Sequence, residues 1–141
     1  AVPMTGKFRH NVDGKGRLFV PAKLREELGE AFYVTIGLGR SLMVLPEQVW
    51  QSIEEKKQSM PMAQTQNLRF FFANALRCEP DKQGRILLPA ALRQYGNLTR
   101  EVVLVGFGDK AEIWDAATYD AMEQAFLQEG TMDQVLSTLE I

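Results

Sequence analysis

The chain has 141 residues, of which 45% are hydrophobic and 24% are charged, and its formal net charge is −2. This composition is typical of a globular protein, and no apolar run reaches the roughly 18 residues that a membrane helix needs. One cysteine, Cys78, excludes an internal disulfide, and one histidine, His10, makes a zinc site within the chain improbable. We therefore expect no metal or other cofactor, and a cytoplasmic chain without a signal peptide.

The charges are unevenly distributed along the chain. Residues 1–29 carry six basic and three acidic side chains, and residues 76–100 carry five and two, so each segment has a net charge of +3. Residues 101–141 carry nine acidic side chains and one basic side chain, a net charge of −8. Two basic segments suit binding to a polyanion such as DNA. The negative charge of residues 101–141 is also explained if their helices simply have solvated acidic faces.

An internal repeat organises the sequence. The segments DGKGRLFVPAKLR at 13–25 and DKQGRILLPAALR at 81–93 are identical at seven of thirteen positions. The similarity continues, with one inserted residue, from 33–50 to 102–119, where a Gly-x-Gly motif recurs. A match of this length at an almost constant offset indicates a duplication.

Each copy predicts the same order of elements: an extended segment, a D-x-x-G turn, a short strand, a helix, and two strands joined through Gly-x-Gly. In the first copy they occupy 7–12, 13–16, 17–20, 21–28 and 32–45. In the second copy they occupy 76–80, 81–84, 85–88, 89–95 and 101–114. Pro21 and Pro89 begin the two helices because proline is tolerated in the first turn, and Gly29 and Gly96 end them.

Further helices are predicted outside the repeated motif. One follows each copy, at 46–57 and 115–128, and Asp115 is a suitable N-cap for the second. Residues 64–76 have apolar side chains at helical spacing. At 131–139 the pattern T-x-x-Q predicts a capping box at the start of a last helix. The predicted domains are a first repeat at 7–50, connecting helices at 51–75, a second repeat at 76–119 and a helical tail at 120–141.

Neither repeat is long enough to bury a hydrophobic core by itself. We therefore predict that the two copies interleave in one core, with Trp50 and Trp114 as anchors of the core or of an interface. Apolar side chains left over at 70–72 and in the tail are expected to contact other subunits.

The D-x-x-G-R turns carry the clearest functional signal. Each turn presents basic side chains at the tip of a hairpin, and a guanidinium group can bind phosphate or guanine through paired hydrogen bonds. Arg9, just before the first turn, extends the basic patch. The candidate DNA-binding residues are Arg9, Lys15, Arg17, Lys82 and Arg85.

The same turns also have a structural explanation. Aspartate at the first position of a turn can accept hydrogen bonds from the backbone ahead of it, and glycine at the fourth relieves strain. The residues assigned to this structural role are Asp13, Gly16, Asp81 and Gly84. The alternative for Arg17 and Arg85 is that they pair with these aspartates and only hold the hairpins.

Other residues give weaker signals. Arg25 and Arg93 either extend the basic face or are merely solvated. His10 has no nucleophile or acid assigned beside it, and a cysteine next to an apolar strand, like Cys78, is more often buried than catalytic. We therefore expect no catalysis.

The duplicated motif D-x-x-G-R-[LI]-x-[VL]-P-A-x-L-R resembles that of the MraZ family, within the wider AbrB/MazE-like group of DNA-binding folds. The resemblance covers essentially the whole chain. It implies an α+β fold: a duplicated swapped-hairpin, or double-split β-α-β, AbrB-like fold with additional helices. The DNA-contacting elements of the family correspond to the turns at 13–17 and 81–85 of this chain, and Arg17 and Arg85 are the matched basic residues.

The resemblance also implies a biological role. Members of the family are bacterial transcriptional regulators, usually repressors, that form ring-shaped homo-oligomers. They bind repeated boxes in double-stranded promoter DNA of the division and cell-wall gene cluster, which implies a nucleoid-associated protein. Met4 is a candidate native start, with Ala1–Pro3 a remnant ahead of it.

Three alternative functions remain open at this point. An antitoxin of the AbrB/MazE group would bind DNA and also a basic toxin through the acidic tail. An enzyme acting on a phosphate or another small molecule would need a set of acid, base and nucleophile that the sequence does not offer. A purely structural ring protein would not retain DNA at all.

Overall fold

The computed structural model describes residues 2–141, and Ala1, part of the candidate remnant, lies outside them. The first repeat consists of β1 (Lys7–Asn11), β2 (Arg17–Phe19), α1 (Ala22–Leu28), β3 (Phe32–Ile36), the 3-10 helix η1 (Leu38–Arg40) and β4 (Leu42–Pro46). The second repeat consists of β5 (Leu76–Cys78), β6 (Arg85–Leu87), α5 (Ala90–Tyr95), β7 (Glu101–Phe107) and β8 (Lys110–Asp115). The other helices are α2 (Glu47–Gln58), α3 (Met62–Thr65), η2 (Gln66–Leu68), α4 (Arg69–Ala73), α6 (Ala116–Gln128) and α7 (Thr131–Thr138).

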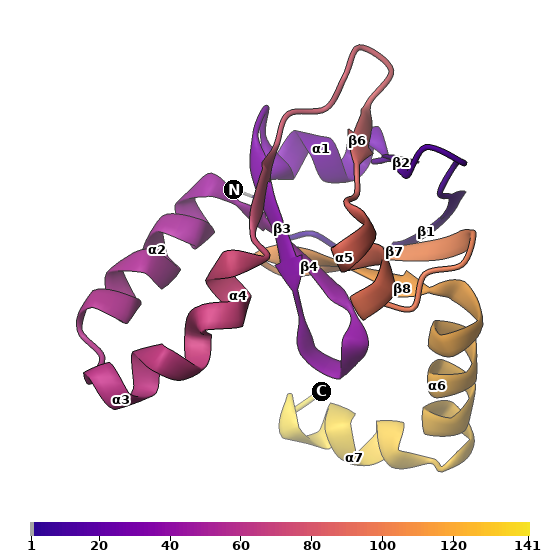
Figure 1. The fold of residues 1–141 in the computed structure, drawn as a ribbon. Helices are drawn as coiled ribbons and strands as arrows, with labels where there is room; N and C mark the ends of the chain where they lie inside the picture. The colour runs from indigo at the N-terminus through magenta and orange to yellow at the C-terminus, as the bar shows by residue number, and fades with distance from the viewer. Residues whose placement is uncertain (1) are drawn as a thin grey trace.

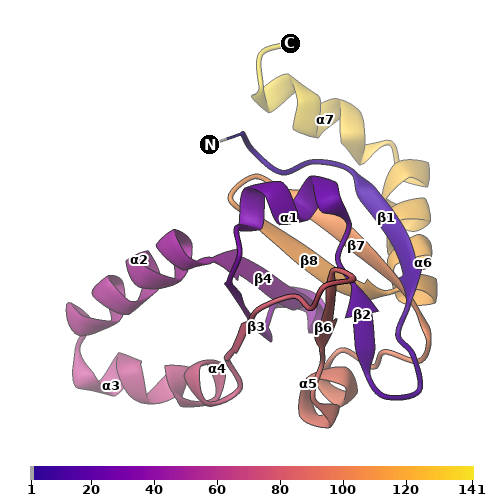
Figure 2. The ribbon, with the colours of Figure 1, turned by 90° about the horizontal axis from the view of Figure 1, so that it is seen from above.

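Each repeat completes the sheet of the other. Within residues 2–141, six antiparallel strands pair in the order β1-β7-β8-β4-β3-β5, so the first strand of each repeat pairs with the third strand of the other. β2 and β6 pair with each other in a separate ribbon, which lies beside α1 and α5 (Figure 2). The predicted α+β class and the predicted exchange of hairpins are therefore confirmed.

The strand registers reveal an approximate two-fold axis between the repeats. In the ribbon, Leu18 faces Ile86, its counterpart in the second copy. In the sheet, β4 pairs with β8, and Met43 faces Glu112, which again are counterparts. The axis therefore passes through the ribbon and through the centre of the six-stranded sheet, and it relates the two D-x-x-G-R turns.

One hydrophobic core lies between the ribbon, the sheet, α1 and α5, and both repeats contribute to it. Successive side chains of a strand point to opposite faces, so one side chain of each three-residue ribbon strand points inward. The largest fully buried side chains include Leu18, Leu24, Phe32, Leu42, Leu88, Leu92, Leu104 and Ile113. The prediction of a single interleaved core is therefore confirmed.

Two helical arms project from opposite sides of this core. The arm formed by α2, α3 and α4 extends on one side, and the arm formed by α6 and α7 extends on the other (Figures 1 and 2). Asp115 caps α6 as predicted, since its carboxylate accepts a hydrogen bond from the backbone N of Thr118 at 3.2 Å. Within the described part of the chain, no helix is both long and apolar enough to cross a bilayer.

Two local predictions are wrong. The helix predicted at 64–76 is divided among α3, η2 and α4, and it ends at Ala73 because Leu76 pairs with Val34 in the sheet. The capping box predicted at 131–139 does not form. Gly130, with φ of 71°, is the N-cap of α7, so Thr131 already lies within the helix.

The aromatic side chains of the connecting helices are only partly available to other subunits. Trp50 stacks on Tyr33, with ring centroids 4.5 Å apart, and contacts Phe71 and Phe72 at 5.8 and 5.4 Å. Phe70 is 68% exposed. Of the three phenylalanines expected to be left over, two are therefore engaged within the chain.

Candidate nucleic-acid interface

Each D-x-x-G-R turn is held by its aspartate. Asp13 Oδ1 accepts hydrogen bonds from the backbone N of Lys15 and of Arg17, both at 2.9 Å, and Asp13 Oδ2 accepts one from Arg17 Nε at 2.7 Å. The second turn repeats this arrangement, with Arg85 Nε 3.0 Å from Asp81 Oδ2. In residues 2–141 the terminal nitrogens of these two arginines make no hydrogen bond. The aspartates thus orient the guanidinium groups and leave their outer nitrogens free to bind a ligand.

These hydrogen bonds keep both aspartates ionised. The pKa of Asp13 is lowered to about 2, chiefly by the backbone N–H of Arg17, and further by the Arg17 side chain and the backbone N–H of Lys15. The pKa of Asp81 is lowered for the same reasons, the backbone N–H of Arg85 being the largest cause. At neutral pH each turn therefore contains a carboxylate that neutralises part of the charge of its arginine.

The fourth residue of each turn leaves no room for a side chain. Gly16 and Gly84 have φ of +85° and +81°, a conformation that favours glycine. A Cβ on Gly16 would lie 3.0 Å from the carbonyl O of Leu88 and 3.1 Å from Arg93 Nε. A Cβ on Gly84 would lie 3.0 Å from Arg25 Cζ. Each turn is therefore pressed against the other repeat.

The two turns lie at opposite ends of the β2–β6 ribbon. The backbone N of Leu88 donates to Gly16 O at 2.8 Å, and that of Val20 donates to Gly84 O at 2.9 Å. Each turn thus adjoins the end of the other repeat's strand. Because the strands are antiparallel, these two junctions are at the two ends of the ribbon.

The outer face of the ribbon brings Arg17 and Arg85 together. Leu18 and Ile86 point into the core, so the residues on either side of them point outward. Arg17 faces Leu87, two residues beyond Arg85, and such diagonal neighbours lie about 7–8 Å apart. The two arginine side chains are 34% and 31% exposed, and both line one shallow hollow of about 280 Å³.

The two predicted lysines flank this face. Lys15 and Lys82 are exposed, one in each turn. The structure therefore brings four of the five candidate residues onto one ribbon and its two ends.

Arg9 lies apart from this group. Its guanidinium forms an ion pair with Asp120 of α6 and lies 3.8 Å from the carboxylate of Glu101. Lys7, on the same strand, pairs with Glu123 of α6 at 2.7 Å. The side-chain bond to Asp120 raises the pKa of Arg9, and the same bond lowers the pKa of Asp120. The acidic tail therefore neutralises part of the first basic segment.

Two arginines that the sequence left undecided lie at the turns. Arg25 Nε donates to the carbonyl O of Val20 at 2.7 Å, and Arg93 Nε donates to that of Leu88 at 2.9 Å. The sequence feature that could have placed these arginines at the turns is the repeated motif P-A-x-L-R. It puts an arginine four residues after each proline, one helical turn into α1 and α5.

The remaining residues with reactive side chains are engaged elsewhere. The ring of His10 packs edge-on against Phe19, with centroids 5.0 Å apart. Cys78 is buried, and burial raises the pKa of its thiol to about 11, so it stays protonated at neutral pH.

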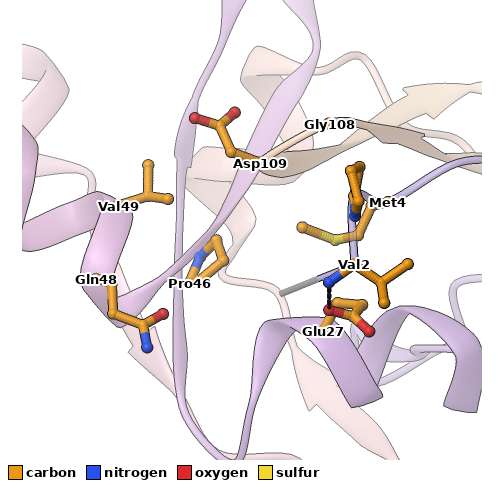
Figure 3. A pocket seen from close by; sticks show the side chains of 9 residues that line it. Val2, Met4, Glu27, Pro46, Gln48, Val49, Gly108 and Asp109 are labelled. Carbon is orange, nitrogen blue, oxygen red and sulfur yellow. Dashed lines mark hydrogen bonds between the residues drawn. The ribbon is translucent and has the colours of Figure 1, made fainter.

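A small apolar pocket lies between the N-terminal segment, α1, α2 and the β7–β8 turn (Figure 3). Its volume is about 260 Å³, and Val2, Met4 and Val49 are among the residues that line it. Glu27 at its edge accepts a hydrogen bond from the backbone N of Val2 at 3.1 Å. The lining residues include none of the candidate DNA-binding residues.

The structure thus combines exchanged hairpins with an arginine-bearing turn at each end of a central ribbon. The family model described as "MraZ protein, putative antitoxin-like" matches the chain twice in tandem, at residues 4–70 and 71–139. The chain belongs to the MraZ family, as its duplicated motif indicated.

Curated relatives extend this result. The chain is 51% identical over 112 residues to the "Transcriptional regulator MraZ" of Carboxydothermus hydrogenoformans, an alignment that covers 77% of this chain and 78% of the relative. It is 48% identical over 118 residues to the protein of the same name from Desulforamulus reducens, which covers 82% and 83% of the two chains. The corresponding protein of Desulfitobacterium hafniense is 50% identical over 117 residues, covering 81% and 82%.

Proposed function

We propose that this protein is a sequence-specific DNA-binding transcriptional regulator, acting as a repressor, and that the outer face of the β2–β6 ribbon with its two turns contacts the DNA. The observation that carries the proposal is the placement of Arg17 and Arg85, both partly exposed, on one outward face, each oriented by an ionised aspartate. A two-stranded ribbon fits the major groove of B-DNA, and outward-facing guanidinium groups can bind guanine or phosphate there. Lys15 and Lys82, at the two ends of the ribbon, suit contacts to the flanking phosphates.

We further propose that several copies act together as a ring-shaped homo-oligomer. One ribbon carries few cations and the whole chain has a net charge of −2, so a single copy would bind DNA weakly. Linking several weak sites raises the overall affinity through a high effective concentration. The arms on opposite sides of the core carry exposed apolar side chains, which suits head-to-tail contacts between neighbours. Copies spaced near one helical turn of DNA, about 34 Å, would reach successive grooves on one side.

The target genes are proposed from the family resemblance. The expected operators are repeated boxes in the promoter of the division and cell-wall gene cluster, which implies a protein of the cytoplasm that associates with the nucleoid. Footprinting on the DNA upstream of the protein's own gene tests this part of the proposal. Protection of a single unrepeated site, or of none, would contradict it.

The decisive variant is Arg17→Ala/Arg85→Ala. We expect a large loss of affinity for the operator duplex in a gel-shift titration. The slope of log affinity against log salt concentration should become less steep by about one unit for each phosphate that the variant no longer binds. The matched control is Lys56→Ala/Arg69→Ala, which removes the same charge from exposed positions on α2 and α4. Equal affinities of the two variants would defeat the assignment of the DNA contacts to the ribbon.

A second candidate function is that of an antitoxin-type DNA-binding protein with a toxin partner. It is favoured by the net charge of −8 in residues 101–141 and by exposed apolar side chains on α6 and α7. Light scattering during gel filtration separates the two functions. A toxin partner predicts a stoichiometric complex with a small basic protein, whereas a regulator alone predicts assemblies of this chain only.

A further inference from the structure

We propose that Arg25 and Arg93 are DNA-binding residues, and that each acts at the turn of the repeat to which it does not belong. This inference rests on the proposed function, because it adds two residues to the same DNA-binding surface. It makes each end of the ribbon a composite site with cations from both repeats.

At one end of the ribbon, a continuous chain of hydrogen bonds joins Arg25 to the second turn. Arg25 Nε donates to the carbonyl O of Val20 at 2.7 Å, and the backbone N of Val20 donates to the carbonyl O of Gly84 at 2.9 Å. A Cβ built on Gly84 would lie 3.0 Å from Arg25 Cζ. The guanidinium group therefore rests directly against the backbone of the turn.

The other end of the ribbon repeats this arrangement through the two-fold relation. Arg93 Nε donates to the carbonyl O of Leu88 at 2.9 Å, and the backbone N of Leu88 donates to the carbonyl O of Gly16 at 2.8 Å. A Cβ built on Gly16 would lie 3.2 Å from Arg93 Cζ. The two copies of the motif thus give the two ends of the ribbon the same geometry.

These two arginines make no direct ion pair in the described chain, although Glu26, Glu30 and Asp81 line the same hollow as Arg25. Among residues 2–141, Arg25 and Arg93 form no ion pair, whereas Arg9 and Arg77 each pair with carboxylates. Arg25 also lies over the ring of Phe19, 5.6 Å from its centroid, a contact that leaves the positive charge in place.

The orientation of both guanidinium groups is fixed. In each, the Nε atom donates to a backbone carbonyl, which sets the plane of the group and leaves its two terminal nitrogens without a hydrogen bond in residues 2–141. A fixed, half-buried cation beside an exposed turn suits a phosphate ligand.

Their position distinguishes them from the arginines of the outer face. Arg17 and Arg85 point outward from the middle of the ribbon, toward the groove in the proposed complex. Arg25 and Arg93 lie at its two ends, where the phosphates on either side of the groove would pass. Each end of the ribbon therefore joins a turn lysine to an arginine of the other repeat, Lys15 with Arg93 at one end and Lys82 with Arg25 at the other, and Arg17 and Arg85 lie between these two composite sites.

The test compares two variants of the full chain that separate charge from hydrogen bonding. Arg25→Gln/Arg93→Gln keeps a side-chain donor for the carbonyls of Val20 and Leu88 but removes both charges. Arg25→Lys/Arg93→Lys keeps both charges. We expect the glutamine variant to bind the duplex from upstream of the gene at least tenfold more weakly. The slope of its log affinity against log salt concentration should become less steep by about two units, because each of the two lost phosphate contacts contributes about 0.9. The lysine variant should keep the wild-type slope.

Thermal unfolding of both variants accompanies the titrations, because a purely structural role would lower stability without changing the slope. A glutamine variant with the wild-type slope overturns the inference, whatever its stability. The variant Arg17→Ala/Arg85→Ala is measured alongside. If it binds like the wild type, the proposed interface itself fails. If it loses binding while the glutamine variant keeps the wild-type slope, only the role of Arg25 and Arg93 fails.

Discussion

The carboxylate of Asp13 couples the first turn to pH. Its pKa is lowered from an ordinary 3.8 to about 2 in the folded chain, chiefly by the backbone N–H of Arg17. A carboxylate whose pKa is lower in the folded chain than in the unfolded chain stabilises the fold. This stabilisation is fully present when the pH is above the pKa of the unfolded chain, and it is lost as the pH falls through the pKa of the folded chain. The stabilisation that the Asp13 carboxylate gives to the turn is therefore lost between about pH 4 and pH 2.

We expect Asp13→Asn to flatten this dependence. The melting temperature of the wild type, measured by circular dichroism, should fall more steeply between pH 4 and pH 2 than that of the variant, because the amide does not titrate there. Parallel curves for the two proteins would contradict the assignment.

Gly16 is the residue of the turn that tolerates least change. Its φ is +85°, and an alanine Cβ at this position would lie 3.0 Å from the Leu88 carbonyl O, so Gly16→Ala imposes both backbone strain and a clash. We expect a loss of about 1–3 kcal/mol in the free energy of unfolding, measured by urea denaturation. Gly14→Ala is the matched control, since a Cβ at Gly14 meets nothing within 4 Å. Equal losses in the two variants would show that the contact with the other repeat is unimportant.

At the scale of elements, the contact between β1 and α6 bears on the role of Arg9. This arginine stays a predicted DNA-binding residue, but its ion pair with Asp120 holds it against the acidic tail. We expect Asp120→Asn to raise affinity for the operator several-fold, because it frees a cation, and to change the melting temperature little, because exposed ion pairs contribute little. Asp133→Asn, on α7, removes the same charge from an exposed position. Identical affinities of these two variants would indicate that Arg9 does not reach DNA.

The elements differ in how far the sequence predicts them. The D-x-x-G-R turns, their strands and the helices after Pro21 and Pro89 follow from residues within a few positions of one another, and the motif predicts them well. The ion pair of Arg9 joins residues 111 positions apart, and local patterns contain no signal for such a pair. The contact between Arg25 and Gly84 likewise forms only when the hairpins exchange. The helical spacing of residues 64–76 predicts a helix that extends to Leu76, but α4 ends at Ala73 because pairing of Leu76 in the sheet overrides this spacing.

At the scale of the whole molecule, the two arms bear on assembly. Exposed apolar side chains occur on the first arm at Met62 and Phe70 and on the second at Leu127 and Leu139. We expect sedimentation to give the wild type a mass several times that of the 15.9 kDa chain. Phe70→Ser/Leu139→Ser should reduce this mass, because it removes apolar area from both arms. A wild-type mass equal to one chain would contradict the ring.

A control for assembly is available on the β3–β4 turn. Leu38 is 80% exposed but lies outside both arms. Leu38→Ser should therefore leave the mass of the assembly unchanged. A loss of mass in this variant would move the subunit contacts away from the arms.

The near-symmetry about Leu18 and Ile86 has a consequence for the polarity of the target. A surface that looks almost the same after half a rotation accepts an asymmetric box in two opposite directions with similar energies. The direction must then be chosen where the copies differ, and within the turns Lys15 corresponds to Gln83 while Gly14 corresponds to Lys82. Exchanging Gly14-Lys15 with Lys82-Gln83 should reverse the preferred direction of binding on each box without changing the affinity for the array of boxes.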